Sequence, residues 1–116
     1  MKRDKAASLL GLAAKAGKVK SGELPVEKAV KSGQARLVIL AMDASDNTKK
    51  KVRNMCTFYK TQEIEYLTRE DLGKAIGKEF RAVCAILDGQ FASAVINSIE
   101  EKSGKVGAVN GKNQNS

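Results

Sequence analysis

The chain has 116 residues, 42% of them apolar, and carries 21 Lys and Arg against 13 Asp and Glu, a formal net charge of +8 at pH 7. That length suits one globular domain and is too short for two of ordinary size. The chain has no His, which removes the commonest general base and metal ligand, so we expect no enzyme, no metal site and no cofactor. An excess of positive charge is typical of proteins that bind polyanions, although surface lysines that only keep a protein soluble give the same total.

Helical and strand patterns alternate along the chain. In chain order they predict a helix over about residues 3–16, a strand at 19–21, a helix at 23–32, a strand at 37–42, a helix reaching 59, a strand at 64–67, a short helix from 68 to about 77, a strand at 82–87 and a helix to about 102. Residues 37–42 and 82–87 are apolar throughout, which indicates strands covered on both faces. The order α-β-α-β-α-β-α-β-α predicts a three-layer α/β/α sandwich with a mixed central sheet of about four strands.

Three further expectations follow from the same patterns. The third helix should bury an apolar stripe and face its cations outward, the stripe being Val52, Met55, Cys56 and Tyr59 and the cations Lys49, Lys50, Lys51 and Arg53. Residues 1–102 should form a single domain, whereas 103–116 contain little to bury and are predicted to be a disordered tail. Cys56 and Cys84 form no CxxC motif, and no segment could span a membrane, so we expect reduced core thiols in a cytoplasmic protein without a membrane partner.

Positive charge is concentrated in the first third of the chain, where residues 1–36 hold nine Lys or Arg against three Asp or Glu. Lys18 and Lys20 lead into Ser21 and Gly22, where the second helix begins. Free backbone N–H groups at a helix start bind phosphate, and a glycine there allows a sugar-phosphate backbone to approach closely. The alternative is an ordinary Ser cap among solvated lysines.

A second candidate site is the loop before the last strand. Lys78, Phe80 and Arg81 place one aromatic ring between two cations, a combination that can stack on an exposed base and bind phosphate. The ring could equally plug the space under a turn. Asp43 and Asp46 follow a buried strand, where ligands often bind in α/β sheets, but lone carboxylates in such a loop more often cap helices.

The residues that suggest a family are Gly22-Glu23, Lys28-Ala29-Val30, Gly33, the strand 35–41 with Asp43, and the run 71–77. In this order and spacing they resemble the L-seven-Ae/L-thirty-e family of ribosomal proteins and kink-turn RNA binders. The bacterial YlxQ-like branch is most similar, because it shares a Ser-Gly-Glu start and the Asp-Ala-Ser-x-Asn-Thr loop found here at 43–48. The resemblance runs from about Lys5 to Ile99 and implies an α/β/α sandwich that binds RNA without catalysis.

The resemblance also implies which residues contact RNA. The family's Gly-x-Asn-Glu-x-x-Lys helix start places its Gly at Gly22 and its Lys at Lys28, and its second contact is the loop 78–82. The Asn and Glu that address the sheared G·A pairs fall on Leu24 and Pro25, which cannot make those hydrogen bonds. We therefore expect binding dominated by phosphate contacts and shape.

These inferences combine into one prediction and one alternative. The chain is predicted to be a monomeric protein that binds structured RNA, with ribosomal RNA and ribosomal proteins as candidate partners. The alternative is a module that docks on the ribosome or translation machinery with weak RNA affinity. The predicted RNA-binding residues are Lys18, Lys20, Ser21, Gly22, Glu23, Lys28, Lys31, Lys78, Phe80 and Arg81.

Overall fold

The computed structural model describes residues 4–103, so the predicted tail, apart from Ser103, lies outside the described residues. The alternating order predicted from the sequence is confirmed. The elements are α1 (Lys5–Lys15), β1 (Val19–Ser21), α2 (Glu23–Lys31), β2 (Leu37–Leu40), α3 (Asp46–Phe58), β3 (Glu63–Glu65), α4 (Arg69–Ala75), β4 (Val83–Ile86) and α5 (Gly89–Ser103).

Side-chain caps fix the starts of α1 and α4. The carboxylate of Asp4 accepts the Ala7 N–H at 3.1 Å and begins α1. The Thr68 hydroxyl accepts the Asp71 N–H at 3.1 Å and begins α4. Each cap satisfies a backbone donor that the first helical turn leaves without a partner.

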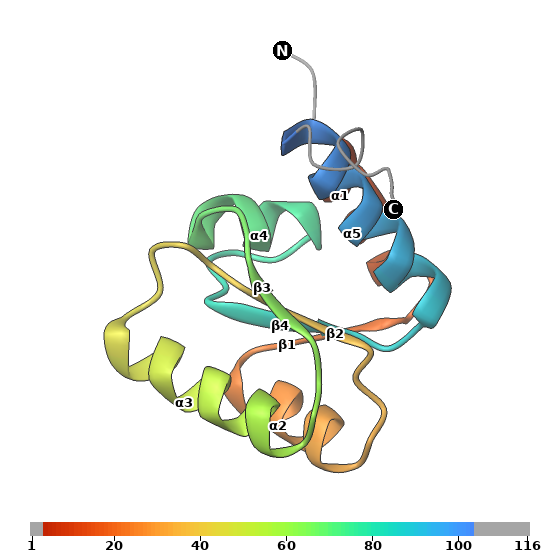
Figure 1. Cartoon of the computed structure of the whole chain (residues 1–116). Coiled ribbons are helices and arrows are strands. Elements are labelled where there is room, and N and C mark those ends of the chain that lie inside the picture. Colours follow the sequence, from red (N-terminus) through yellow and green to blue (C-terminus); the bar gives the residue numbers. More distant parts are fainter. Residues whose placement is uncertain (1–3, 104–116) are drawn as a thin grey trace.

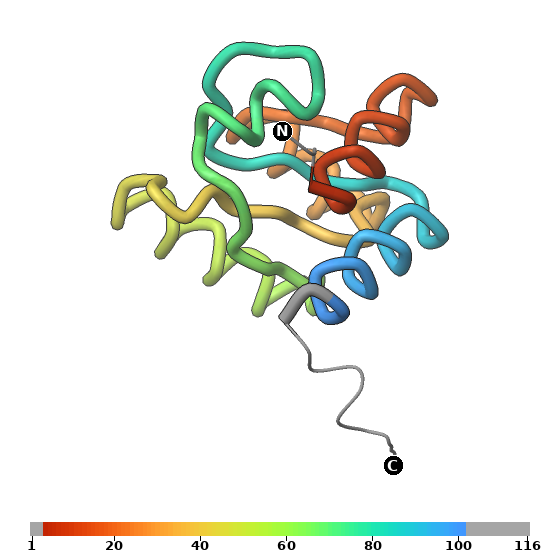
Figure 2. Tube along the Cα trace, turned by 90° about the horizontal axis from the view of Figure 1, so that it is seen from above, coloured from red at the N-terminus to blue at the C-terminus, as the bar shows by residue number. Residues whose placement is uncertain are grey.

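The four strands form one mixed sheet in the order β1-β4-β2-β3. β4 pairs antiparallel with both β1 and β2, whereas β2 and β3 are parallel. Helices α1, α4 and α5 cover one face of this sheet and α2 and α3 cover the other (Figure 1). From above, α1 and α5 lie side by side (Figure 2). The prediction of a three-layer α/β/α sandwich is confirmed.

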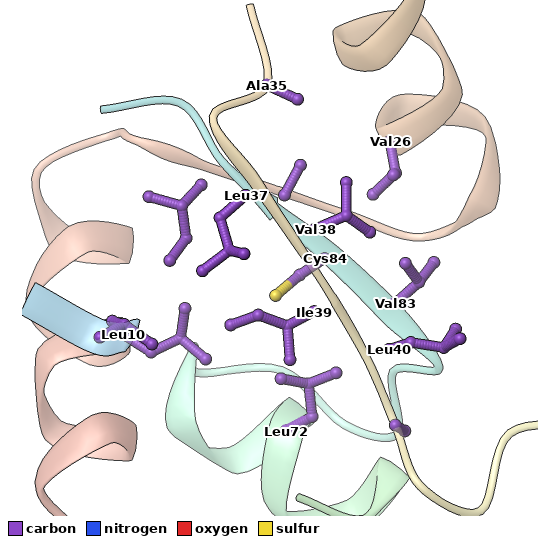
Figure 3. Close-up of a cluster of buried hydrophobic side chains, with 14 of the residues drawn as sticks. Leu10, Val26, Ala35, Leu37, Val38, Ile39, Leu40, Leu72, Val83 and Cys84 are labelled. Atoms are coloured by element: carbon purple, nitrogen blue, oxygen red, sulfur yellow. The ribbon is translucent and has the colours of Figure 1, made fainter. Parts of the chain in front are cut away.

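The core consists of two apolar layers, one on each side of the sheet. Every residue of β2 and β4 is buried, as expected for strands covered on both faces. Along β2, Leu37 and Ile39 point toward Leu10 and Leu72, while the intervening Val38 and Leu40 point to the opposite side, where Val26 lies (Figure 3). This alternation follows from the two-residue period of a strand.

The two cysteines lie in this core as reduced thiols, which confirms the sequence expectation. Burial raises the pKa of Cys56 to about 11 and that of Cys84 to about 12. Both thiols therefore stay protonated and unreactive near neutral pH. Within residues 4–103, no helix combines the length and apolar character that crossing a bilayer requires.

Two burial predictions are wrong. β2 ends at Leu40 rather than 42, because the chain turns there, and Met42 is 51% exposed. The sequence predicts Tyr59 in the apolar stripe of α3, but this residue is 40% exposed. It follows the last helical residue, Phe58, and its ring packs against that exposed neighbour instead of the core.

The strand directions bring four connecting segments to one edge of the sheet. β1, β2 and β3 run toward this edge and β4 runs away from it. At this edge the strands connect to residues 21–23, 43–48, 67–69 and 78–81. We call these four segments together the Gly22 edge. It lies on the left in Figure 1.

Candidate nucleic-acid interface

Gly22 forms the start of α2 in a conformation that requires glycine. Its φ of 94° and ψ of 157° lie in a region that side chains do not tolerate. No side chain caps α2, whereas Asp4, Ser45 and Thr68 cap α1, α3 and α4. The interpretation of Ser21 as an ordinary helix cap is therefore wrong, and the start of α2 keeps backbone donors that a ligand can use.

Ser21 joins the two candidate segments instead. Its hydroxyl accepts a hydrogen bond from Nε of Arg81 at 3.2 Å. The Gly22 N–H donates to the Val83 carbonyl at 3.0 Å, so the helix start and the loop before β4 are fixed to each other. The structure therefore makes the two candidate segments direct neighbours.

The loop 78–81 is held against α4 by close backbone contact. The Lys78 N–H donates to the Gly73 carbonyl at 2.8 Å, and the Arg81 N–H donates to the Arg69 carbonyl at 3.1 Å. A Cβ on Gly73 would lie 1.3 Å from the carbonyl oxygen of Glu79, so only glycine permits this approach. Sequence analysis missed this role of Gly73, for which a glycine inside a predicted helix was the available signal.

The side chain of Phe80 points away from the core, with 67% of its surface exposed. The alternative in which this ring plugs the space under a turn is therefore wrong. Arg81 is half-buried and also donates from Nη1 to the Phe80 carbonyl at 2.9 Å. The loop thus presents an aromatic ring beside a positioned guanidinium, while Lys78 is exposed.

Lys20 of β1 and Lys28 of α2 lie on one groove. They line a shallow groove of about 410 Å³ whose other residues are Leu24, Pro25, Ala29, Ser32 and Gln34. Leu24 is 68% exposed and Lys28 is exposed as well. The groove therefore combines two cations with apolar surface along α2.

Lys18 and Lys31 lie away from the Gly22 edge. The Lys18 carbonyl accepts the Leu87 N–H at 2.8 Å, beyond the opposite end of β4. Lys31 occupies the last turn of α2 and pairs with Glu27 at 2.7 Å. The hydrogen bond between these two side chains raises the pKa of Lys31 and lowers that of Glu27. Of the predicted residues, these two are not brought together with the others.

Glu23 is occupied by contacts to α3. Its carboxylate accepts a hydrogen bond from the Thr48 hydroxyl at 3.0 Å and lies 3.6 Å from Nζ of Lys51. Thr48 in turn donates its backbone N–H to Ser45, the cap of α3. The start of α3 is thereby tied to the start of α2, a connection that sequence analysis did not predict.

Asp43 links the ends of two further strands. Its carboxylate accepts the Arg69 N–H at 2.7 Å and lies 3.6 Å from Nε of the same residue. That backbone hydrogen bond, followed by the charge of Arg69, lowers the pKa of Asp43. Asp43 is therefore a capping residue as interpreted, although it caps α4. The same interpretation is wrong for Asp46, because Ser45 caps α3.

No group of three His, Cys, Asp or Glu placed to hold a metal occurs among the described residues.

Comparison with known proteins identifies the family. The model described as the ribosomal protein L7Ae/L30e/S12e/Gadd45 family matches residues 4–96. The chain therefore belongs to this family, as the resemblance in its sequence predicted.

Individual relatives cover nearly the whole domain. The RNA-binding protein YlxQ of Bacillus subtilis (strain 168) is 46% identical over 92 residues, which cover 79% of this chain and 92% of that protein. A solved structure of a protein with unknown function from Bacillus halodurans is 42% identical, has a TM-score of 0.81 and covers 84% of this chain and 99% of its own. A 15.5 kD RNA-binding protein of Giardia lamblia shares the fold, with a TM-score of 0.70 at 20% identity over 91% of this chain and 94% of its own.

Proposed function

We propose that this protein binds structured RNA, ribosomal RNA being one candidate, at the Gly22 edge and without catalysis. The observation that carries the proposal is the hydrogen bond from Arg81 to Ser21, which unites an uncapped helix start with a basic and aromatic loop. Family membership and the similarity to a relative named as an RNA-binding protein support the same function. We further propose that the protein acts in the cytoplasm as a monomer.

Each part of the edge suits a different feature of RNA. The start of α2 offers backbone N–H groups and the positive end of the helix dipole to a phosphate. Lys28 and Lys78 are exposed beside it and add cations to the same surface. Phe80 supplies a flat ring on which an unpaired base can stack. Phosphate contacts set affinity and position, and they carry little sequence information.

Selectivity for a kink-turn should be modest. Leu24 and Pro25 stand where relatives that read G·A pairs have hydrogen-bonding side chains, and neither can replace them. Glu23, the nearest acidic residue, is engaged by Thr48 and Lys51. The protein should therefore prefer a kink-turn over a matched duplex mainly through shape.

A salt titration tests the proposal. If cations neutralise phosphates, log K falls linearly with log salt, with a slope of roughly −0.7 to −0.9 per phosphate contacted. Lys28→Ala should make this slope less steep by roughly 0.7 to 0.9, the amount expected for one lost phosphate contact. Arg36→Ala, which removes one exposed charge at the opposite end of β2, is the matched control and should leave the slope nearly unchanged.

Docking on a protein is the second candidate, and exposed apolar side chains favour it. Leu24, Met42 and Phe80 are each more than half exposed, and all three belong to segments at or next to the Gly22 edge. Affinity for RNA that stays flat from low to physiological salt would support this candidate and contradict RNA binding through phosphates.

A further inference from the structure

An exposed aromatic pair lies at the end of α3, far from the Gly22 edge. Phe58 is 76% exposed, more than any other large apolar side chain among the described residues, and Tyr59 is 40% exposed. Their ring centroids are 4.9 Å apart with an interplanar angle of 76°, so the two rings meet edge to face. The Phe58 ring contributes little to the core, because water still covers most of its surface.

Lys60, the next residue, has a strained backbone. Its φ is 58°, the left-handed conformation that closes α3, where the Thr61 N–H donates to the Cys56 carbonyl at 2.8 Å. The equivalent positions after α1, α2 and α4 are the glycines 17, 33 and 77, with φ of 75°, 79° and 75°. A lysine at this position costs stability that glycine would not. Its presence beside the rings indicates a role outside the fold, because strained residues gather at functional sites.

The surroundings of the pair are polar and include the exposed cation Lys60. Lys31, at the end of the neighbouring α2, is close enough to Tyr59 for the two side chains to interact electrostatically. Two carboxylates lie in the same region: Glu27 is paired with Lys31, and Glu63 interacts electrostatically with Cys56 near the end of α3. The flanking residues Thr57, Thr61 and Gln62 are polar, so the apolar surface is limited to the two rings. A stable protein interface buries about 800 Å² on each partner, far more than two rings supply, whereas one ring suffices to stack a base.

We propose that Phe58, Tyr59, Lys60 and Lys31, the Phe58 surface, bind unpaired nucleotides that extend from the RNA held at the Gly22 edge. This inference rests on the proposed function and adds a second contact region to it. The 13-residue helix α3 starts at the Gly22 edge and ends at the Phe58 surface, so about 20 Å separates the two. Figure 1 shows α2 and α3 following the same face of the sheet between these places. Phe58 stacks on a base and Lys60 neutralises a flanking phosphate, while Lys31, which is paired with Glu27, borders the site.

The test compares one kink-turn RNA in a blunt form and with ten unpaired uridines added at either end. The wild-type protein should bind one extended form roughly 5- to 150-fold more tightly than the blunt form, the range expected for one stacked base. Phe58→Ala should abolish this gain and leave affinity for the blunt RNA unchanged. Leu12→Ala removes another exposed apolar side chain, 55% exposed on α1, and should alter neither affinity.

Lys60→Gly separates binding from folding. Because glycine relieves the left-handed backbone, this variant should have a Tm roughly 4 °C higher than the wild type and yet show a smaller gain from the extension. If Lys60→Gly keeps the full gain, the lysine has no role in binding, and that part of the proposal is overturned.

The outcomes distinguish this inference from the proposed function. If the blunt RNA binds but neither extension helps, or Phe58→Ala keeps the gain, the Phe58 surface is not an RNA contact. If the blunt RNA does not bind, the proposed function fails, and free decauridine then decides whether Phe58 binds single strands by itself. Sedimentation as a dimer that Phe58→Ala converts to a monomer would assign the surface to a second copy of the chain and overturn the proposal.

Discussion

Gly73→Ala should displace the loop 78–81 and thereby weaken RNA binding. The added Cβ would lie 1.3 Å from the Glu79 carbonyl oxygen, and real Cβ atoms do not approach closer than 3.0 Å, so that oxygen must move by about 1.7 Å. The neighbouring hydrogen bond from the Lys78 N–H to the Gly73 carbonyl, now 2.8 Å, breaks or lengthens with this movement. Phe80 and Arg81 follow in the same short loop and lose their positions relative to Ser21.

The magnitude follows from three opposing effects. Overpacking costs about 1–3 kcal/mol and the lost hydrogen bond about 1 kcal/mol, while alanine favours the helix by about 1 kcal/mol over glycine. The free energy of unfolding should therefore fall by roughly 2 kcal/mol, equivalent to a Tm lower by roughly 8 °C. Measured well below this Tm, RNA affinity should fall by about tenfold because the loop no longer presents its cation and ring together.

Gly89→Ala is the matched control. Gly89 also lies in a helix, but nothing lies within 4 Å of a Cβ placed there. This variant should keep its RNA affinity and be at least as stable as the wild type. A Gly73→Ala protein with unchanged Tm and unchanged RNA affinity would refute the argument that the loop's contact with α4 positions the binding residues.

Three further variants test individual contacts. Ser21→Ala frees the Arg81 side chain and should reduce RNA affinity about 3- to 10-fold, while the free energy of unfolding falls by no more than about 1 kcal/mol. A larger fall in the free energy of unfolding would indicate that the variant loses affinity because it unfolds. Leu24→Asn combined with Pro25→Glu should increase the preference for a kink-turn over a matched duplex at fixed salt, and strong selectivity already present in the wild type would contradict this. Asp43→Asn should lower the Tm at pH 7, where the carboxylate is ionised. Folding lowers the pKa of Asp43 from 3.8, so the stabilisation by its carboxylate is complete above pH 3.8 and is lost as the pH falls further. The Tm values of the wild type and of Asp43→Asn should therefore converge in acid. A Tm difference that stays constant with pH would refute this.

The sequence predicted the order of elements because apolar periodicity carries that information directly. Residues 37–40 and 83–86 are buried on both faces, and no surface strand would have that composition. The residues at which strands and helices end were less predictable. Met42 and Tyr59 continue apolar patterns past the points where the backbone turns, and only the hydrogen bonds of the turn decide their exposure.

The candidate site was predictable as two segments but not as a connected surface. Residue types alone marked the helix start at Gly22 and the loop containing Phe80. Their connection depends on the hydrogen bond between Ser21 and Arg81, 60 residues apart, and on the contact of the loop with Gly73. Contacts at such separation follow from strand order, which local patterns do not encode. For the same reason the sequence predicts Lys31 as part of the site, although this residue lies at the far end of its helix.

The arrangement of helix starts explains why this edge suits an anion. α2, α3 and α4 each follow a strand that runs to the Gly22 edge, so three helix dipoles direct their positive ends there. The starts of α3 and α4 are satisfied within the protein by Ser45 and Thr68, and the Asp43 carboxylate adds negative charge at α4. Only α2 begins at a glycine without a side-chain cap, among the helix starts of α1 to α4. A phosphate placed there meets backbone donors, while Glu23, the one carboxylate in that first turn, is held by Thr48 and Lys51 of α3. The contact between the two helices thus partly offsets the repulsion that this carboxylate would exert on RNA.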